Sequence, residues 1–423
     1  MSGQLLYATG NVDKRTIAKY EKEAKTLNRE SWFLAFIMDT NDEERAKGKT
    51  VEVGRAHFQT ENRRFTVLDA PGHKNYVPNM IQGAAQADIG VLVISARKGE
   101  FETGYERGGQ TREHALLAKT LGVKELLVVV NKMDDSTVNW SKDRYDTIEK
   151  KINNFLKKNG FKKKNIRFVP ISAITGDNVY KPVPESTCSW YKGETMLSLL
   201  DAIAIEGRDP NAPLRIPILD KFTDRGTGIM GKIETGSVRV GQKVSIYPGG
   251  HKGSVEGITI GDSADDSVDA AFPGENVEIR IKGIHEDHIK KGFVLADSKQ
   301  PVPVVSKLQA QLQVLDLEDQ KVFTAGYNAI MHIHTMQEEI TVEKLQKSYD
   351  PEKKEEKTNP RFVKSHQTCD CVISLAQTIA CEKYDNLQQL GRFTIRNQGR
   401  TVAIGKITGL PKKALVEAGQ VKE

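Results

Sequence analysis

Three largely apolar stretches constrain the fold of this chain more than any other feature. They occupy residues 88–96, 125–131 and 166–172, and in none of them do apolar and polar residues alternate. Such runs are typical of strands that are buried on both faces of a sheet. A glycine-led segment with helical periodicity, 108–123, separates the first two runs. The pattern therefore predicts an α/β domain with a mostly parallel sheet.

The segments before these runs fit the same domain. Apolar residues recur at helical spacing over 13–28, which predicts an amphipathic helix. Residues 51–58 and 64–68 read as two strands that are joined by a short polar link.

The character of the chain changes at residues 206–218. Three prolines, Pro210, Pro213 and Pro217, mark this segment as a linker. Beyond it the strands are short, they alternate with period two, and glycines recur at the turns. This pattern predicts two antiparallel β-barrels that are divided near 297–305. The alternating apolar residues that carry this prediction are Val277, Ile279, Ile281, Ala310, Leu312 and Val314.

These patterns predict four parts of the chain. We expect an α/β domain over 1–207, a first barrel over 208–300, a second barrel over 301–412 and a frayed tail over 413–423. The charged stretch at 349–361 is expected to be an exposed loop of the second barrel.

Composition limits the partners and the cellular location that the sequence is compatible with. The formal net charge of +6 suits a polyanionic partner such as the ribosome, but it suits a mixed-sign surface equally well. The four cysteines form no C-x-x-C pair, which is typical of reduced, partly buried thiols. No apolar run approaches the ~20 residues of a membrane span, and the start lacks the features of a signal peptide. We expect a cytoplasmic monomer without a DNA or membrane partner.

The pentapeptide D-A-P-G-H follows the strand that ends at residue 68. Asp69 at a strand end can hold Mg²⁺ through water, while Ala70 and Pro71 lead the chain to a phosphate. The backbone of Gly72 can approach that phosphate closely because no side chain blocks it. His73 would then face the attacking water. A plain strand-to-helix turn with a capping aspartate is the alternative.

The tetrapeptide N-K-M-D follows the apolar run that ends at residue 131. Guanine presents two adjacent donors, and the Asp134 carboxylate can accept both. Asn131 would hydrogen-bond the base and a neighbouring loop, and the stem of Lys132 can lie over the base. Polar residues also commonly follow strands for other reasons.

Two weaker candidates complete the set. The Ser172 hydroxyl and the Ala173 N–H, at the end of the run 166–172, could close a base pocket. Thr50 lies on a loop that leads into a strand, and its hydroxyl could ligate Mg²⁺ when the terminal phosphate is present. Taken alone, Thr50 is better explained as a solvated loop residue.

The order of these motifs favours one kind of site. The threonine loop, D-x-x-G, N-K-x-D and S-A follow one another at spacings of about 20, 60 and 40 residues. The last three each follow a buried strand. The sequence therefore predicts a site for GTP or GDP with Mg²⁺.

At this point the chain resembles the translational GTPases, and among them the eukaryotic class II peptide-release factors. The resemblance implies a GTPase domain followed by two β-barrels, with GTP hydrolysis coupled to translation termination on the ribosome, where rRNA is contacted. It also implies a class I release factor as partner. Ribosome rescue and aminoacyl-tRNA delivery are the alternatives within the family. The segments that carry the resemblance are 69–104, 108–123, 130–140, 188–193, 215–222, 327–335 and 391–407.

One feature departs from the family pattern. The family has a G-x-x-x-x-G-K-[ST] loop that cradles phosphates, and no such run occurs here. The only G-K-[ST] is residues 48–50, where Glu43 stands in place of the first glycine and a strand follows. We expect the first strand and the phosphate loop to be missing from this sequence. A non-hydrolysing adaptor that binds its partner through the barrels is therefore an alternative for the chain as printed.

Three further features are open to more than one interpretation. Residues 391–399 read as a β-hairpin, and the resemblance implies that Gly391, Arg392, Phe393 and Thr394 contact the class I factor. His332 and His334 have the spacing of metal ligands but lack a third, so a polar strand face is expected. The lysine run 162–164 could contact rRNA, although a solvated helix end explains it more simply.

Overall fold

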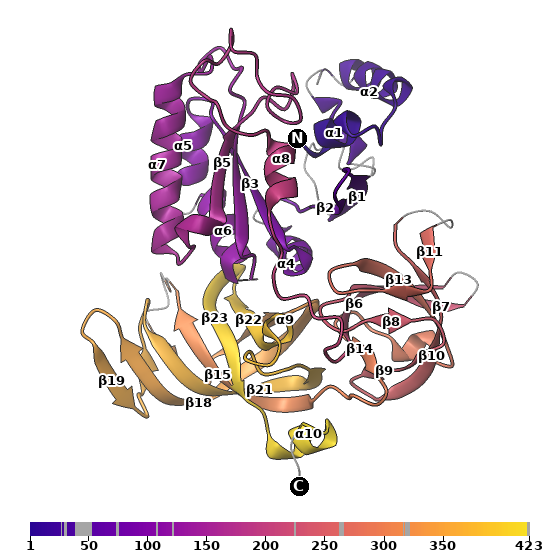
Figure 1. Cartoon of the computed structure of the whole chain (residues 1–423). Helices are drawn as coiled ribbons and strands as arrows, with labels where there is room; N and C mark the ends of the chain where they lie inside the picture. Colours follow the sequence, from indigo (N-terminus) through magenta and orange to yellow (C-terminus); the bar gives the residue numbers. More distant parts are fainter. Residues whose placement is uncertain are drawn as a thin grey trace. The chain divides into compact units, whose positions relative to one another are not determined.

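The computed structural model describes most of the chain (Figure 1). The chain divides into two compact units, the first made of Met1–Lys119 and Val123–Ile205 and the second of Thr120–Gly122 and Glu206–Glu423. The described residues are 1–26, 28, 32–38, 53–72, 76–106, 109–120, 122–223, 226–261, 266–315, 317 and 322–420.

A parallel three-stranded sheet forms the centre of the first unit. Its order is β3 (Ile89–Ser95), β4 (Glu125–Asn131) and β5 (Ile166–Pro170). Along β4, Leu126, Val128 and Val130 enter one core, and Leu127 and Val129 enter another. The strand is apolar throughout because both of its faces are covered, as predicted.

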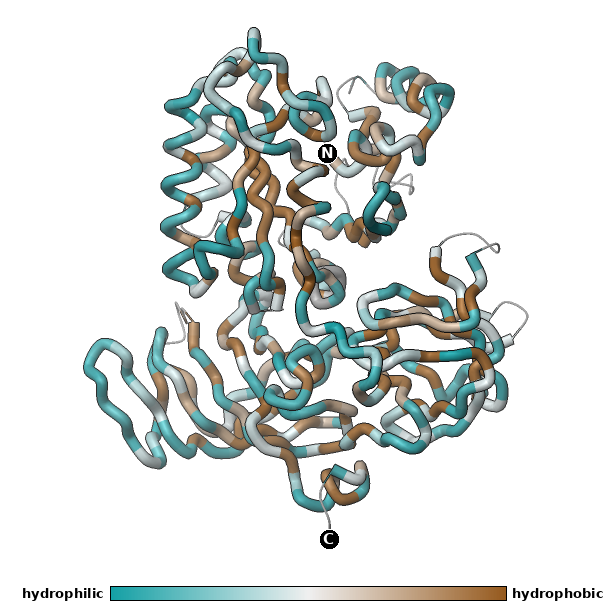
Figure 2. The backbone as a smooth tube through the Cα atoms, in the orientation of Figure 1, coloured by the Kyte–Doolittle hydropathy of each residue, from teal (hydrophilic) through white to brown (hydrophobic). Residues whose placement is uncertain are grey.

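Helices cover the two faces of this sheet. Figure 1 shows α7 (Lys142–Lys158) and α5 (Glu100–Tyr105) on one face and α8 (Met196–Ala202) on the other. Residues of α1 (Ser2–Ala8) share the core of the second face with α8. In Figure 2 the three strands form the most continuously hydrophobic part of this unit.

The expectation of a strand buried on both faces is wrong for β3. Most of its residues are only half-buried, and Val93 is 42% exposed. Within the described residues β3 pairs with β4 alone, so it is an edge strand.

A separate antiparallel pair lies beside these elements in the sequence. β1 (Gly54–Gln59) pairs with β2 (Arg64–Asp69), and Phe58 stacks on Phe65 with ring centroids 4.8 Å apart. The predicted amphipathic helix is confirmed as α2 (Lys14–Thr26), which buries Ile17 and Ala24. The remaining helical elements of the first unit are Ala35–Ile37 (3-10), α4 (Val77–Gln86), α6 (Gln110–Thr120) and Lys163–Asn165 (3-10).

The second unit contains the two predicted antiparallel barrels. In the first barrel, β13 buries Val277, Ile279 and Ile281 in alternation, and the pairing of β9 with β10 closes the sheet. Its strands are β6 (Arg215–Thr223), β7 (Thr227–Lys232), β8 (Val238–Arg239), β9 (Lys243–Tyr247), β10 (His251–Thr259), β11 (Ser267–Val268), β12 (Ala270–Ala271), β13 (Asn276–Lys282) and β14 (Val294–Asp297), with a 3-10 helix at Glu286–His288.

The second barrel is closed by the pairing of β17 with β18, and Ala310, Leu312 and Val314 point into its core as predicted. The turn between β22 and β23 is formed by Gln398 and Gly399, both with positive φ, which suits a two-residue hairpin. The strands are β15 (Val304–Val314), β16 (Phe323–Thr324), β17 (Asn328–Ile333), β18 (Met336–Asp350), β19 (Glu355–Thr358), β20 (Phe362–Val363), β21 (Thr368–Ala380), β22 (Arg392–Asn397) and β23 (Arg400–Gly409), with helices α9 (Gln388–Gly391) and α10 (Lys412–Glu417).

A buried ion pair joins the two barrels. Arg215 in β6 donates from Nε to Glu382 Oε1 at 3.0 Å, and both side chains are 4% exposed. Arg215 also donates to the carbonyl oxygens of Gln300 and Pro301 in the segment between the barrels. The charge is therefore compensated and its remaining donors are satisfied.

The structure corrects four expectations about this unit. Pro217 belongs to β6 rather than to a linker, next to a register shift where a missing N–H is tolerated. Most of 349–361 lies in the β18–β19 hairpin, so this stretch is exposed as expected but is not a plain loop. The tail is not frayed, because α10 buries Ala414 and Leu415. His332 and His334 do not form a polar face, because they are buried.

Burial also changes the protonation of these histidines. It lowers the pKa of both His332 and His334 to about 4, so they are neutral at pH 7. The four cysteines are free and buried, as predicted. Among the described residues no helix is long and apolar enough to cross a membrane.

Candidate functional site

The carboxyl ends of β3, β4 and β5 lie at one edge of the parallel sheet. The strands pair in register from Ile89 with Glu125 and from Leu126 with Ile166. The loops that follow Asn131 and Pro170 therefore meet at this edge, which is where open α/β sheets bind ligands.

Asn131 joins two of the predicted motifs. Its Oδ1 accepts a hydrogen bond from the backbone N–H of Lys132 at 2.8 Å and another from the N–H of Ala173 at 2.9 Å. The N–H of Met133 also donates to the carbonyl oxygen of Ile171. The N-K-M-D and S-A segments, 42 residues apart at this bond, thus form one fixed surface.

Asp134 lies exposed on this surface. Among the described residues its carboxylate makes no hydrogen bond and no ion pair, so both oxygens face solvent. The neighbouring Lys132 has a positive φ of 62°, which is uncommon for a residue with a Cβ and marks a tightly specified turn. The turn presents an acceptor pair whose backbone is held by the bonds of Asn131.

Ser172 and Ala173 support the surface from behind. Ser172 is fully buried, and its Oγ accepts a hydrogen bond from the N–H of Thr175. From the sequence we expected the N–H of Ala173 to be available to the base. In the structure it donates to Asn131 instead. The structure therefore brings this pair to the site, with the N–H holding the loop.

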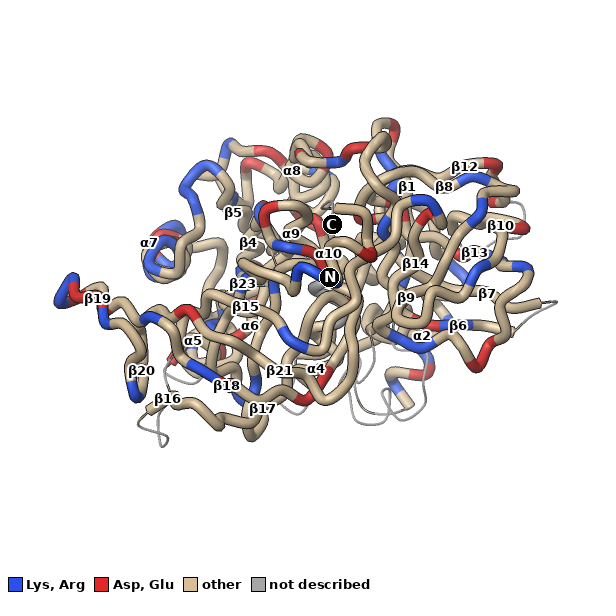
Figure 3. Tube along the Cα trace, turned by 90° about the horizontal axis from the view of Figure 1, so that it is seen from below, with Lys and Arg blue, Asp and Glu red and all other residues tan. Residues whose placement is uncertain are grey.

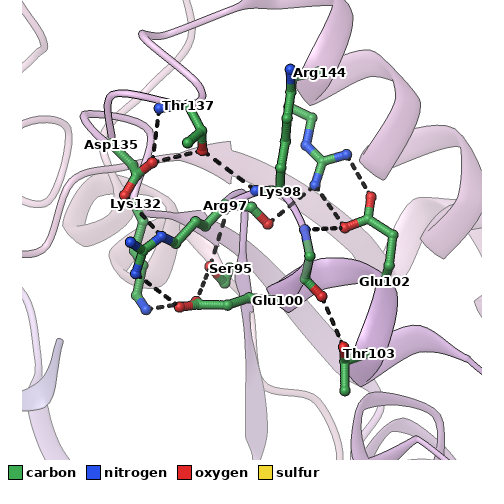
Figure 4. Close-up of polar contacts among 11 residues, drawn as sticks. Ser95, Arg97, Lys98, Glu100, Glu102, Thr103, Lys132, Asp135, Thr137 and Arg144 are labelled. Atoms are coloured by element: carbon green, nitrogen blue, oxygen red, sulfur yellow. Dashed lines mark hydrogen bonds and ion pairs between the residues drawn. The ribbon is translucent and has the colours of Figure 1, made fainter.

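A polar network extends the site toward the end of β3 (Figure 4). Glu100 Oε2 accepts from Lys132 Nζ at 2.7 Å and from Ser95 Oγ at 2.7 Å. The ammonium of Lys132 is the main cause of the lowered pKa of Glu100. Arg97 forms ion pairs with Glu100 and with Asp135, which cross-links the loop after β3 to the loop after β4.

Arg144 anchors the same network from α7. Its guanidinium donates to the carbonyl oxygens of Ala96 and Arg97 and to both carboxylate oxygens of Glu102. This bidentate pairing lowers the pKa of Glu102 to about 2. Glu102 also caps α5 by accepting from the N–H of Gly99 at 2.7 Å.

The D-A-P-G-H segment is described in part. Asp69 ends β2 and is half-buried, Ala70 is half-buried, Pro71 is buried and Gly72 is exposed. The amino group of Met1 is buried near Asp69. Burial lowers the pKa of this amino group, and the Asp69 carboxylate opposes that shift. His73 and Thr50 lie outside the described residues.

His114 in α6 lies next to Gly72. A Cβ built on Gly72 would be 3.8 Å from His114 Cε1. Burial lowers the pKa of His114, and within the described residues its buried Nε2 has no hydrogen-bond partner. Sequence reasoning did not identify this neutral imidazole.

The four predicted partner residues of the second barrel are mostly covered. Gly391, Phe393 and Thr394 are buried, Phe393 in the barrel core, and Arg392 is half-buried. In the part of the chain that the structure describes, no group of three or more His, Cys, Asp or Glu is arranged to hold a metal.

Sequence reasoning also missed Glu100, Glu102 and Arg144. The spacing of Gly99 and Glu102, three residues apart, is typical of a helix start and was a signal for Glu102 but not for Glu100. No sequence pattern near the site could indicate Arg144, because it is 42 residues away from its partner Glu102 in the sequence.

Comparison with known proteins agrees with this geometry. Residues 1–206 match the family described as the elongation factor Tu GTP binding domain, and residues 307–408 match the GTP-eEF1A C-terminal domain-like family. The crystal structure of the Saccharomyces cerevisiae Ski7 GTPase-like domain bound to GTP has the same fold. It is 18% identical with a TM-score of 0.76, covering 96% of this chain and 93% of that one.

Two relatives are similar over nearly the whole chain, and both are named eukaryotic peptide chain release factor GTP-binding subunit. The Kluyveromyces lactis protein is 50% identical over 96% of this chain, which spans 58% of that relative. The Candida maltosa protein is 47% identical over 97% of this chain, which spans 57% of that relative. Residues 1–206 thus match a GTP-binding domain family, and the chain as a whole is similar to the GTP-binding subunits of eukaryotic release factors.

Proposed function

We propose that this protein binds guanine nucleotides and hydrolyses GTP as a translation termination factor. One observation carries the proposal. Asn131 ties the N-K-M-D loop to the S-A loop, and the Asp134 carboxylate is exposed and has no partner among the described residues. Because the chain spans 58% of its first relative, hydrolysis and partner binding are proposed for the whole protein.

Base recognition follows from the shape of this surface. The two oxygens of Asp134 accept the two adjacent donors of guanine, whereas adenine would leave one oxygen unpaired. Glu100 holds the ammonium of Lys132, so the lysine stem stays beside the base. Ser172 and Ala173 keep the second loop in place.

The phosphate side is assigned to the segment after β2. Asp69 offers a hard oxygen that suits Mg²⁺ through water, together with the Thr50 hydroxyl. When bound, Mg²⁺ supplies positive charge against the phosphate oxygens. The backbone of Ala70, Pro71 and Gly72 borders the terminal phosphate, and His73 orients the attacking water.

The partners are proposed from the names of the relatives. A subunit of a peptide chain release factor acts with another subunit, and we propose a class I release factor for that role, on the ribosome in the cytoplasm. The β22–β23 hairpin is the proposed contact surface, around Arg392. The proposed domains are 1–207, 208–300 and 301–412, with 413–423 as a C-terminal segment.

A competition experiment tests the proposal. Fluorescent GDP bound to the whole protein should be displaced by unlabelled GDP and not by ADP, and a class I factor should be retained on the immobilised 423-residue chain. Equal displacement by ADP would refute base recognition by Asp134. Retention of the factor without any nucleotide binding would favour the non-hydrolysing adaptor for this chain.

A further inference from the structure

A long stretch of the first unit contains no acidic residue. Between Lys150 and Gly176 there is neither Asp nor Glu. The stretch covers the end of α7, the 3-10 helix Lys163–Asn165 and the whole of β5. Its basic residues are Lys150, Lys151, Lys157, Lys158, Lys162, Lys163, Lys164 and Arg167.

The fold adds lysines from a second segment to this stretch. Lys119 Nζ lies 4.9 Å from the centroid of the Phe161 ring, and the carbonyl oxygen of Lys124 accepts a hydrogen bond from Asn165 Nδ2. We define the lysine cluster as Lys119, Lys124, Lys157, Lys158, Lys162, Lys163 and Lys164 (Figure 3). Lys119 is half-buried, and the other six lysines of the cluster are exposed.

The charges of the lysine cluster are not compensated within the described part of the chain. None of its lysines forms an ion pair there, although exposed lysines elsewhere do, such as Lys142 with Asp146. Burial lowers the pKa of Lys119, and the ammonium of Lys162 lowers it further. The fold therefore holds like charges close enough to disfavour one another.

Helix stability accounts for only part of the lysine cluster. Cations near a helix carboxyl end interact favourably with the helix dipole, and Lys157 and Lys158 lie in the last turn of α7. The effect falls off beyond that turn, so it does not explain residues 162–164. It does not explain Lys124 either, which directly precedes β4, whereas Lys119 lies in the last turn of α6 and is accounted for in the same way as Lys157 and Lys158.

The composition of the cluster indicates the kind of ligand. Phe161, against which Lys119 packs, is buried, and residues 157–166 include no exposed large apolar side chain. A protein interface would need an apolar anchor at its centre, and a single-stranded nucleic acid would need exposed aromatic rings for stacking. The nearby Arg167 donates to the carbonyl oxygen of Leu199 and does not join the cluster. Exposed ammonium groups alone suit phosphate contacts that are independent of sequence.

We propose that the lysine cluster binds the phosphate backbone of double-helical RNA. The choice of RNA rests on the proposed function in translation. The cluster precedes β4 and β5, so it lies at the amino edge of the parallel sheet, opposite Asn131. At ~3.3 Å per residue, the length of β4 separates the two edges by about 20 Å, so RNA and nucleotide do not compete for one surface.

Fluorescence anisotropy with a labelled RNA duplex of 20 base pairs tests the proposal on the full chain without nucleotide. Lys162→Gln, Lys163→Gln and Lys164→Gln together should weaken binding by about tenfold at 100 mM KCl. They should also reduce the slope of log K against log[salt] by about 2 to 3, because each lost phosphate contact removes about one counterion. The matched control replaces Lys353, Lys354 and Lys357 of the β18–β19 hairpin by Gln and should bind like the unmodified chain. Arginine at 162, 163 and 164 should restore binding.

Other outcomes overturn the proposal. Unchanged RNA binding in the glutamine variant removes the cluster as the site. Cluster-dependent binding of polyglutamate but not of RNA assigns the surface to an acidic protein, and a preference for a DNA duplex overturns the assignment to RNA. GDP binding, measured on the whole protein, separates the two claims. Absence of GDP binding by the whole protein, with cluster-dependent RNA binding retained, refutes the proposed function alone, whereas normal GDP binding with cluster-independent RNA binding refutes this inference alone.

Discussion

The two edges of the parallel sheet in the first unit organise charge in opposite ways. At the carboxyl edge, Lys132 pairs with Glu100 at 2.7 Å, Arg97 with Asp135 at 3.2 Å, and Arg144 with Glu102 at 2.8 Å. At the amino edge, the lysine cluster has no ion pair within the described residues. One edge has fixed polar geometry, and the other has an uncompensated electrostatic field.

This difference indicates what each edge recognises. Asp134 has no partner within the described residues, although the charges around it are paired. Such a carboxylate selects a small ligand by the positions of the ligand's hydrogen-bond donors. Unpaired lysines attract any polyanion with a strength that falls steeply as salt rises. The paired edge should therefore be sensitive to single substitutions, and the unpaired edge to total charge.

The largest expected effect at the paired edge is a change of base preference. Asp134→Asn should favour xanthine over guanine nucleotides, because xanthine has a carbonyl where guanine has its amino group and an amide matches that pair. Discrimination by such bonds reaches about 10⁴-fold. Competition between GDP and XDP measures it on the whole protein. Asp135→Asn is the matched control, and it should keep the preference for guanine. An unchanged preference in Asp134→Asn would mean that this carboxylate does not read the base.

A second substitution tests whether the network supports the edge. Arg144→Ala should lower the free energy of unfolding by about 2 kcal/mol, because the carbonyl oxygens of Ala96 and Arg97 lose a charged donor. Urea unfolding followed by circular dichroism measures this loss. Lys142→Ala removes an exposed pair with Asp146 and should cost no more than about 0.5 kcal/mol. Equal losses in the two variants would show that the Arg144 network adds nothing to stability.

A smaller effect is expected from the acid that holds Lys132. Glu100→Gln keeps the shape of the side chain but removes the charge that pairs with Lys132 Nζ. GDP should dissociate about three- to fivefold faster, which corresponds to the loss of one charged contact at a partly exposed site. Stopped-flow displacement measures the rate, with Glu106→Gln as the exposed control. The same acceleration in the control would exclude a specific role for Glu100.

The smallest expected effect depends on pH. Because Arg144 lowers the pKa of Glu102 to about 2, the pair contributes stability that is complete above the ordinary pKa of 4.5 and is lost as the pH falls toward 2. The difference in unfolding free energy between the unmodified chain and Arg144→Ala should therefore shrink between pH 5 and pH 2.5. Glu102 is 41% exposed, so solvent weakens this contribution. A constant difference over that range would place the effect of Arg144 on its carbonyl contacts alone.

Much of the fold could be predicted from periodicity. The continuous apolar run of β4 and the alternating residues of β13 and β15 report burial directly, because each strand lies in the interior of its sheet. The burial of β3 was misjudged because its apolar run resembles that of β4. In the sheet β3 lies at the edge, and a sequence does not show which strands pair with which. The docked helix α10 was missed because six residues show too little periodicity to separate a helix from a tail.

The candidate site was predictable only in its local parts. Each motif follows a strand, so the loops at Asn131 and Ser172 could be placed at one edge from the sequence. The bond from Ala173 to Asn131 could not, because it depends on the register of β4 against β5. The roles of Asp134, Asp69 and Gly72 stay predictions. Those of His73 and Thr50 also stay predictions, and both residues lie outside the described part.

The buried pair between Arg215 and Glu382 has a consequence for how the chain is handled. The second oxygen of Glu382 accepts a hydrogen bond from Gln420 at 2.7 Å, close to the end of the described chain. A truncation before α10, or a bulky tag fused closely behind it, therefore disturbs a carboxylate that also neutralises Arg215. Removing the last residues from an expressed chain would therefore weaken the Arg215–Glu382 contact between the barrels, although the truncation lies far from Arg215 in the sequence.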